Sequence, residues 1–205
     1  MKKSSPKMDR RTKILKCAVE LIDQEGMIAL TARNIAKKLK IPSSAVFYYF
    51  PTHLELYAGA QAYTMTEAEQ IVSQTLAKNK RSHSGLGLLQ TYIAGTLMWA
   101  FRHPSHVKVL TAGFIHSMGP DELDQQYRAT TAQGIEKIYH WLVMAVAEKE
   151  LKELSQIRQV AELIHSLLTG LCMKLVVQSP KNETELNNIT DMTWSMIETY
   201  IRSAK

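Results

Sequence analysis

The side chains best suited to recognition chemistry in this 205-residue chain lie close together near its start. Arg33, Ser43, Ser44 and Tyr48 bring a guanidinium, two small hydroxyls and a phenol into one short stretch. A guanidinium can donate two parallel hydrogen bonds to the O6 and N7 atoms of guanine, and hydroxyl groups can donate to phosphate oxygens. These groups could serve the recognition of phosphates and base edges if the elements that carry them present them on one surface.

Other residue combinations do not point to catalysis. His103 and His106 have the spacing of a metal-binding pair, with His116 further on, but Pro104 is expected to break the helix between them. No cysteine or carboxylate completes a ligand set nearby. The chain also lacks a glycine-rich phosphate loop after a strand and a nucleophile elbow. We therefore expect no enzyme activity, no metal and no cofactor.

The positive charge of the chain is concentrated in its first quarter. Residues 1–53 hold 11 basic and 4 acidic side chains, whereas residues 54–205 hold 14 and 15, for a net charge of +6 overall. A basic unit attached to a near-neutral body indicates a polyanion-binding module joined to a second unit. A solvated, lysine-rich N-terminus without a partner explains the composition equally well.

Cysteine use and hydropathy suggest where the protein acts. Cys17 and Cys172 are far apart, which excludes a disulfide framework and favours a reducing, cytoplasmic setting. The basic first residues precede no apolar stretch and so do not form a secretory signal. The longest uncharged segment, residues 82–101, has too short an apolar part to span a bilayer. We expect it to form a buried helix, and we expect no membrane partner.

Apolar residues recur at helical spacing along nearly the whole chain, without sustained strand-like alternation. The spacing predicts an all-α fold of about nine helices. The first helix should run from about Asp9 to Glu25, with Gly26 ending it in a left-handed cap. Thr31 should cap a second helix that ends near Leu39.

A third short helix should follow after a tight turn. Pro42 disfavours helical geometry at Ile41 and can begin a new helix, which we place from Ser43 to about Tyr49, before Pro51. Two short helices joined in this way have the layout of a helix-turn-helix, whose second helix presents its first residues to the major groove of DNA. The expected small core consists of Ile35, Ala36, Leu39, Ile41 and Val46.

The same residues resemble the DNA-binding domain of the TetR family of transcriptional regulators. The resemblance covers about residues 9–57 and rests on three ordered segments: LTARNIAKKL at 30–39, IPSS at 41–44 and VFYYF at 46–50. The rest of the chain is similar to the family only in length and helical character. The resemblance implies a homodimeric regulator, more often a repressor than an activator, that alters its grip on a double-stranded DNA operator when a small-molecule effector binds the C-terminal domain.

The resemblance also implies roles for individual residues. Thr31 matches the phosphate-contacting start of the second helix, where unpaired backbone N–H groups assist. Arg33 matches a position that often reaches base edges. The base-proximal start of the recognition helix is formed by Ser43, Ser44 and Ala45.

Aromatic residues end this segment. Phe47 and Tyr48 match positions against the sugar–phosphate backbone, with the Tyr48 hydroxyl as a phosphate donor. Core packing is the alternative for Phe47, Tyr49 and Phe50, and it is the favoured interpretation for Phe50.

The chain departs from the family pattern at two places. Lys40 stands where the family usually has glycine in the turn, so a left-handed backbone there would be strained by about 1 kcal/mol. Pro51 and His53 stand where lysines are common. His53 could still donate to a phosphate from the start of the fourth helix, more strongly when protonated.

The remainder of the chain should form a second, helical unit. We expect a DNA-binding domain at residues 1–51, with a basic N-terminal arm, and an effector-binding and dimerisation domain at residues 52–205. Proline and polar breaks delimit six further helices, at about 52–79, 86–102, 105–117, 121–149, 155–178 and 183–203.

The last two helices are apolar on more than one face. By resemblance they would form a four-helix dimer interface with their copies, and a two-fold dimer implies a pseudo-palindromic operator. The expected interface residues are Leu163, Leu167, Leu171, Met192, Met196 and Ile197.

Methionine and aromatic residues on the middle helices are candidates for the lining of an effector pocket. They suit an apolar or amphipathic effector, because methionine adapts in shape and tryptophan stacks. No excess of carboxylates indicates a polycationic ligand, and ordinary core packing is the alternative for each candidate. The candidates are Met65, Tyr92, Trp99, Phe114, His116, Tyr127, Trp141, His165 and Met173.

One alternative of a different class remains open. The protein could be a helical dimer whose basic N-terminal unit binds protein or an anionic membrane and not a specific DNA site. Membrane binding would need a continuous apolar stripe opposite the lysines, whereas the first helix needs its apolar stripe for the core of the head. A DNA reader needs Arg33, Ser43, Ser44 and Tyr48 exposed, so exposure of these side chains distinguishes the two.

Overall fold

The computed structural model describes residues 9–78, 83–116, 122–152 and 154–203, without the side chains of 113–116, 122–124 and 126. These residues form nine α-helices and no strand, so the all-α prediction is confirmed. The elements are α1 (Arg10–Glu25), the 3₁₀ turn η1 (Met27–Ala29), α2 (Ala32–Leu39), α3 (Ser43–Tyr49), α4 (His53–Lys78), α5 (Gly85–Arg102), α6 (Pro104–His116), α7 (Glu122–Ala147), α8 (Ile157–Val177) and α9 (Glu183–Ser203). Every expected helix is present, whereas η1 was not predicted. The expected basic arm, residues 1–8, lies outside the described residues.

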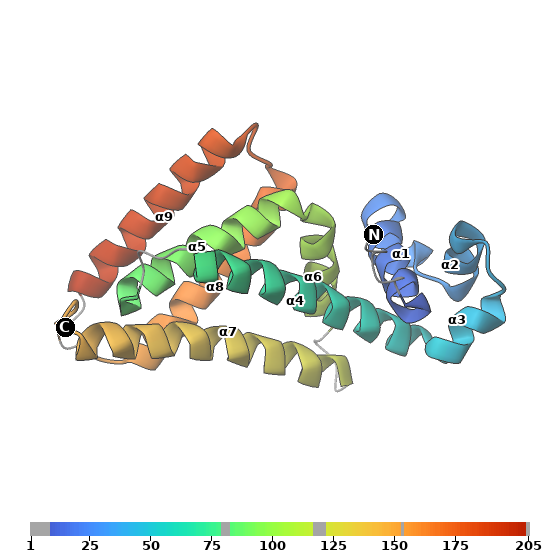
Figure 1. Ribbon diagram of the computed structural model, residues 1–205, viewed down its shortest axis with the longest axis horizontal. Helices are drawn as coiled ribbons and strands as arrows, with labels where there is room; N and C mark the ends of the chain where they lie inside the picture. Colours follow the sequence, from blue (N-terminus) through green and yellow to red (C-terminus); the bar gives the residue numbers. More distant parts are fainter. Residues whose placement is uncertain (1–8, 79–82, 117–121, 153, 204–205) are drawn as a thin grey trace, which may run out of the picture.

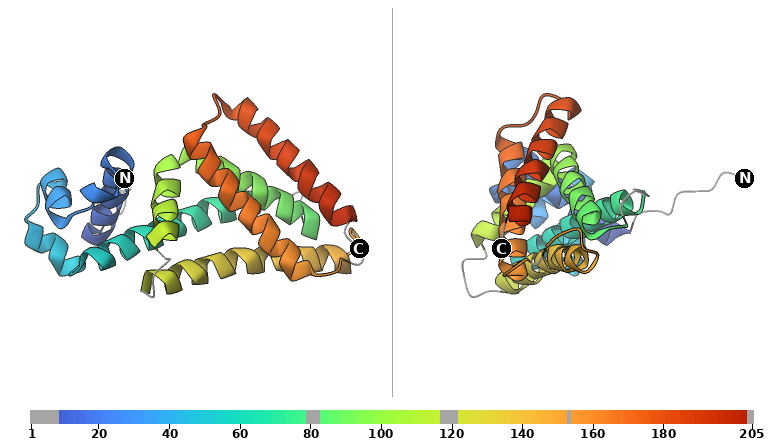
Figure 2. Two further views of the ribbon diagram at one scale, coloured as in Figure 1. Left: turned by 180° about the vertical axis from the view of Figure 1, so that it is seen from behind. Right: turned by 90° about the vertical axis from the view of Figure 1, so that its left-hand side faces the viewer.

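The helices form a small head and a larger body (Figure 1). The head consists of α1, α2 and α3 at one end of the molecule, and α4 runs from the head into the body. The body contains α5, α7, α8 and α9, while α6 lies between the body and α1. Seen from behind, α8 and α9 diverge like the arms of a V from the turn that joins them (Figure 2).

The head has its own hydrophobic core. Ile14 of α1, Ile35 of α2 and Val46 of α3 are fully buried in it, and Ile35 and Val46 were expected there from the sequence. The core also takes in Tyr57 of α4 and Val109 of α6, which belong to helices that continue into the body. Because the first turns of α4 pack on the head, the division at residues 51 and 52 stays a prediction.

The end of α1 differs in detail from the expectation. Gly26 follows α1 with φ 79° and ψ 179°, and its N–H donates to the carbonyl O of Ile22 at 3.0 Å. The positive φ favours glycine, but the ψ value is far from that of the left-handed helical conformation. The prediction of a left-handed cap was therefore wrong, because the chain turns directly into η1 after Gly26.

The body is built around α5, which contacts α4, α6, α7, α8 and α9. Leu89, Ile93 and Leu97 of α5 are fully buried, which confirms the expectation of a buried helix in the uncharged segment. Among the described helices, α8 alone is long and apolar enough to cross a membrane, judged by length and composition only. It packs on α5, α6 and α7, so part of its apolar surface belongs to the body core.

The start of α5 is fixed by the end of α7. The N–H of Gly85 donates to Glu148 Oε2 at 3.1 Å, and the N–H of Leu86 donates to Glu150 Oε2 at 3.0 Å. Two carboxylates therefore satisfy N–H groups that have no partner within the helix. The two backbones approach so closely that a Cβ on Gly85 would lie 2.3 Å from the carbonyl O of Trp141 and 2.4 Å from the N of Ala145.

We predict that Gly85→Ala lowers the free energy of unfolding by about 1–3 kcal/mol, because the added methyl group must push two helix backbones apart. The measurement is urea denaturation at one fixed protein concentration. Gly95→Ala on the same helix is the matched control, since its Cβ would meet Thr75 Cγ2 at an ordinary 3.4 Å. Similar losses for the two variants would contradict the close-approach explanation.

Candidate nucleic-acid interface and internal cavity

Local hydrogen bonds set the geometry of the helix-turn-helix. The Thr31 hydroxyl accepts from the N–H of Asn34 at 3.1 Å, which confirms Thr31 as the N-cap of α2. The Asn34 side-chain amide donates to the carbonyl O of Ala29 at 3.0 Å and so ties α2 to η1. Both bonds hold the start of α2 in a fixed orientation relative to the end of α1.

The turn between α2 and α3 passes through Lys40. This residue has φ 55° and ψ 45°, the left-handed conformation expected from its position. The turn is closed by the N–H of Ile41, which donates to the carbonyl O of Ala36 at 3.0 Å. Pro42 then precedes α3, which begins at Ser43 as predicted.

The predicted DNA-contacting side chains lie on the outside of the head to different degrees. Arg33 and Ser44 are exposed, Phe47 is 53% exposed and Tyr48 is 81% exposed. His53 is exposed in the first turn of α4. The half-buried members of the predicted set are Thr31, Ser43 and Ala45.

The aromatic run is divided between surface and core. Phe50 is only 3% exposed and belongs to the head core, as favoured from the sequence. Tyr49 is half-buried and packs edge-on against the Tyr48 ring, with 5.1 Å between ring centroids. This ring contact packs one side of the exposed Tyr48 side chain.

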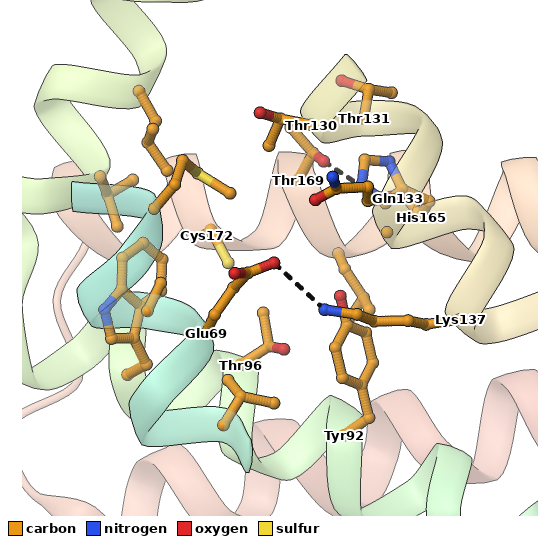
Figure 3. Close-up of a pocket in the computed structure, with 18 of the residues that line it drawn as sticks. Glu69, Tyr92, Thr96, Thr130, Thr131, Gln133, Lys137, His165, Thr169 and Cys172 are labelled. Atoms are coloured by element: carbon orange, nitrogen blue, oxygen red, sulfur yellow. Dashed lines mark hydrogen bonds and ion pairs between the residues drawn. The ribbon is translucent and has the colours of Figure 1, made fainter. Parts of the chain in front are cut away.

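The body contains a cavity of about 320 Å³ that is open to solvent and is lined by residues of α4 to α8 (Figure 3). Its lining includes seven of the nine residues that sequence reasoning singled out: Met65, Tyr92, Trp99, Tyr127, Trp141, His165 and Met173. Phe114 and His116 fall in α6, but their side chains lie outside the described part of the chain.

Sequence reasoning missed most of the polar residues of the cavity. Polar side chains on a helix are ordinarily expected to face solvent, so no local signal marked these residues. They become visible only when the helices are packed together. The additional polar lining residues are Gln61, Glu69, Ser73, Thr96, Thr111, Thr130, Thr131, Gln133, Lys137 and Thr169.

An ion pair spans the cavity from α4 to α7. Lys137 Nζ lies 3.3 Å from Glu69 Oε1, and both side chains remain close to half exposed (Figure 3). On the neighbouring wall, His165 packs so closely on α7 that a Cβ on Gly134 would lie 2.7 Å from its ring. The pair therefore belongs to the solvent-accessible part of the lining, and His165 to a tightly packed part.

Burial shifts the pKa values of His165, Cys172 and Tyr92 in the lining toward the uncharged forms. It lowers the pKa of His165 and raises the pKa of the Cys172 thiol to about 12. Burial is also the main cause of the raised pKa of Tyr92, with a smaller contribution in the same direction from Cys172. Near neutral pH, these three groups add no charge to the cavity.

Helix α6 is shared between the cavity and the head. Val107, Leu110 and Thr111 line the cavity. Lys108 Nζ donates to Asp23 Oδ1 of α1 at 2.6 Å, while Val109 is fully buried in the head core. These contacts place cavity-lining and head-contacting residues one position apart on a single helix.

Helix α4 reinforces this connection. The Tyr57 hydroxyl donates to the carbonyl O of Val109 at 3.2 Å, within the buried region between α4 and α6. Further along α4, Met65 and Glu69 line the cavity. Two helices therefore connect the cavity with the head.

An exposed apolar face runs along α8 and α9. Among the predicted interface residues, Leu163 is 58% exposed, Leu167 37%, Met192 61% and Met196 59%. Leu171 is half-buried, and with Leu167, Met192 and Met196 it lines a shallow groove between the two helices. Ile197 is different, because it is only 4% exposed and packs in the body core.

The histidine pair lies at the joint between α5 and α6. His103 ends α5 and Pro104 begins α6, so the predicted helix break is confirmed. The rings of His103 and His106 are 5.2 Å apart, and burial lowers the pKa of His106 to about 4. Within the described residues, no group of three histidine, cysteine or acidic side chains could hold a metal ion.

A helix-turn-helix head that shares helices with a cavity-bearing helical body defines a class of regulatory DNA-binding proteins. Residues 14–60 match the family model described as bacterial regulatory proteins, tetR family. The match identifies residues 14–60 as a DNA-binding domain of the tetR-family type.

Full-length comparisons agree with this assignment. The chain is 22% identical over 200 residues to a nucleoid occlusion factor, SlmA, of Shewanella baltica, with 95% of each chain covered. It is 21% identical over 193 residues to the SlmA protein of Haemophilus influenzae, covering 93% of this chain and 85% of the relative.

Solved structures share the whole fold. A TetR transcription regulator from Haloarcula marismortui has a TM-score of 0.78 at 14% identity, covering 92% of this chain and 97% of the other. A TetR transcriptional regulator from Legionella pneumophila has a TM-score of 0.71 at 18% identity, covering 96% and 100%. At these identities, the likeness establishes the fold alone.

We predict that Lys40→Gly raises the free energy of unfolding by about 1 kcal/mol, because glycine adopts the left-handed backbone without steric cost. Urea denaturation measures the change. As a control, Lys37→Gly inside α2 should lower stability by about 1 kcal/mol. If Lys40→Gly lowered the free energy of unfolding as much as Lys37→Gly does, the backbone at Lys40 would not be strained.

Proposed function

We propose that this protein is a cytoplasmic, sequence-specific DNA-binding regulator of transcription that acts as a homodimer on a pseudo-palindromic operator. In this proposal it is a repressor, and a small, largely apolar effector bound in the cavity releases it from DNA. The observation that carries the proposal is α6, which lines the cavity through Val107 and Leu110 and packs in the head core through Val109.

The shared helices supply a physical route from effector to head. An effector shifts an equilibrium only when it binds one arrangement of the protein better than another. A molecule that displaces Val107 and Leu110 must also move Val109 and Lys108, because a helix backbone is stiff over one turn. The head can then change its position relative to the body, and with it the separation of the two heads in a dimer.

The head offers the side chains that DNA reading requires. Arg33, Ser44 and Tyr48 are exposed, and no carboxylate among the described residues pairs with Arg33. By contrast, Lys38 contacts Gln24 and Glu20 within the head. Arg33 is therefore free to bond a base edge, with Ser44 and Tyr48 available for further base or phosphate contacts.

Selection of bound sequences from random duplex DNA tests this assignment. We predict that the purified protein enriches a pseudo-palindrome and that Arg33→Ala, Ser44→Ala and Tyr48→Ala together abolish the enrichment, because they remove the base and phosphate donors. Arg158→Ala, which removes one exposed arginine of the body, is the control and should keep it.

Two results would contradict the assignment. Salt-sensitive binding without sequence preference would make the head a general polyanion surface. Co-sedimentation with anionic vesicles that survives the triple substitution would favour the protein- or membrane-binding alternative.

The exposed apolar face on α8 and α9 is the proposed dimer interface. We leave Ile197 out of it, because this side chain is buried within one chain. The remaining five predicted residues are exposed or half-buried, and association with a second copy would remove them from water.

We predict that Leu167→Glu converts a dimer of twice 23.2 kDa into a monomer, because it places a charge in the centre of an apolar interface. Light scattering coupled to gel filtration measures the mass. Val143→Glu on α7 is the matched control, since Val143 is 38% exposed and Leu167 37%. Equal masses for the two variants, whether both dimeric or both monomeric, would contradict this interface.

A second candidate function follows from the full-length relatives. Their name assigns them to nucleoid occlusion, and they match this chain over nearly its whole length. If this chain shares that role, cells that lack it should place division septa across the chromosome. Normal septum placement together with altered transcription near the selected DNA sites would favour the regulator of transcription.

A further inference from the structure

Of the described helices that line the cavity, α7 contributes the most polar side chains, and α4 adds Gln61, Glu69 and Ser73. Helix α7 contributes Thr130, Thr131, Gln133 and Lys137 to the lining, whereas α6 contributes Val107, Leu110 and a single hydroxyl. Figure 3 shows the α7 threonines and Gln133 close to His165 and Thr169 of α8. The cavity therefore has one wall of hydroxyl, amide and imidazole groups and another that is mainly apolar.

The described lining carries no unbalanced charge. Its charged members are Glu69 and Lys137, and they neutralise each other at 3.3 Å. The groups of His165, Tyr92 and Cys172 are uncharged near neutral pH for the reasons given above. A charged ligand would thus find no free counter-charge among the described lining residues.

We propose that the cavity selects an uncharged amphiphile, with an apolar body and hydroxyl or carbonyl oxygens along one edge, and that the Glu69–Lys137 pair discriminates against charged analogues. This inference rests on the proposed role of the cavity as an effector site. It goes further by naming the chemical class of the ligand and the two side chains that set it.

The energetic argument compares charged and uncharged head groups. An uncharged oxygen exchanges its water for the hydroxyls and amides of α7 and α8 and stays hydrogen-bonded. A carboxylate or ammonium loses more hydration and then meets one side chain of its own sign beside the one of opposite sign. To use Lys137, an anion must separate it from Glu69 and leave that carboxylate nearby.

The orientation of the ligand follows from the two walls. Oxygen atoms directed to α7 leave the apolar body to the apolar part of the lining, which includes Val107 and Leu110 of α6. At these two residues the cavity meets the helix shared with the head. A ligand that fits the polar wall would therefore also contact α6, the helix shared by the cavity and the head.

Three probes with the same decyl chain and different head groups test the inference: decanol, decanoate and decylammonium. Binding is followed near neutral pH by tryptophan fluorescence, since Trp99 and Trp141 line the cavity, and by the shift in melting temperature. We expect decanol to bind about tenfold more tightly than either charged probe, because the charge of a carboxylate or ammonium head group would be incompletely compensated in the cavity.

Two variants assign the selectivity to the ion pair. Glu69→Gln leaves Lys137 unpaired and should strengthen decanoate binding by about threefold, while Lys137→Gln should do the same for decylammonium; the change is modest because both side chains are close to half exposed. Glu136→Gln is the matched control, because Glu136 pairs with Arg158 and does not line the cavity. It should leave the preference for decanol unchanged.

The outcomes separate this inference from the proposed function. Equal binding of all three probes to the natural protein, or no change of preference in the two variants, would overturn the charge selection while leaving the effector cavity in place. Failure of every probe to bind would overturn both the selection and the effector role. The DNA-binding part of the proposed function is tested independently by sequence selection.

Discussion

The structure depends on one constraint: the head and the body share two helices. Val109 is buried in the head core although it belongs to α6, and Tyr57 of α4 donates a hydrogen bond to its carbonyl group. Neither unit can therefore complete its hydrophobic core without the other. The head is positioned by the same two helices, α4 and α6, that line the cavity, so the position of the head and the shape of the cavity depend on one packing arrangement.

Much of the fold could be predicted because local signals mark the ends of the helices. Thr31 caps α2, Pro42 precedes α3 and Pro104 begins α6, each for a reason that concerns only neighbouring residues. The left-handed conformation of Lys40 was expected from the resemblance, because the family usually has glycine at that position. Gly26 was misjudged because its geometry depends on η1, which no periodic pattern announces.

The faces of the helices were harder to predict than their ends. α9 is apolar on two sides, and the sequence could not decide that Ile197 packs into the body while Met192 and Met196 remain outside. The same uncertainty hid Thr130 and Gln133, which look like surface residues until α7 is packed against its neighbours. Aromatic and methionine residues were easier to assign to the cavity, because large apolar side chains are rarely left in water.

The placement of the polar wall on α7 affects how the protein can diverge. α7 packs on α4, α5, α6 and α8, whereas the contacts with α1 come from α4 and α6. Exchanges among small polar residues on α7 can therefore alter which molecule is recognised without disturbing the core of the head. Substitutions in α6 are more constrained, because they change both the lining of the cavity and the contact with the head. Under the proposed function, duplicated copies of the gene would acquire new effectors chiefly through α7 while retaining their DNA sites.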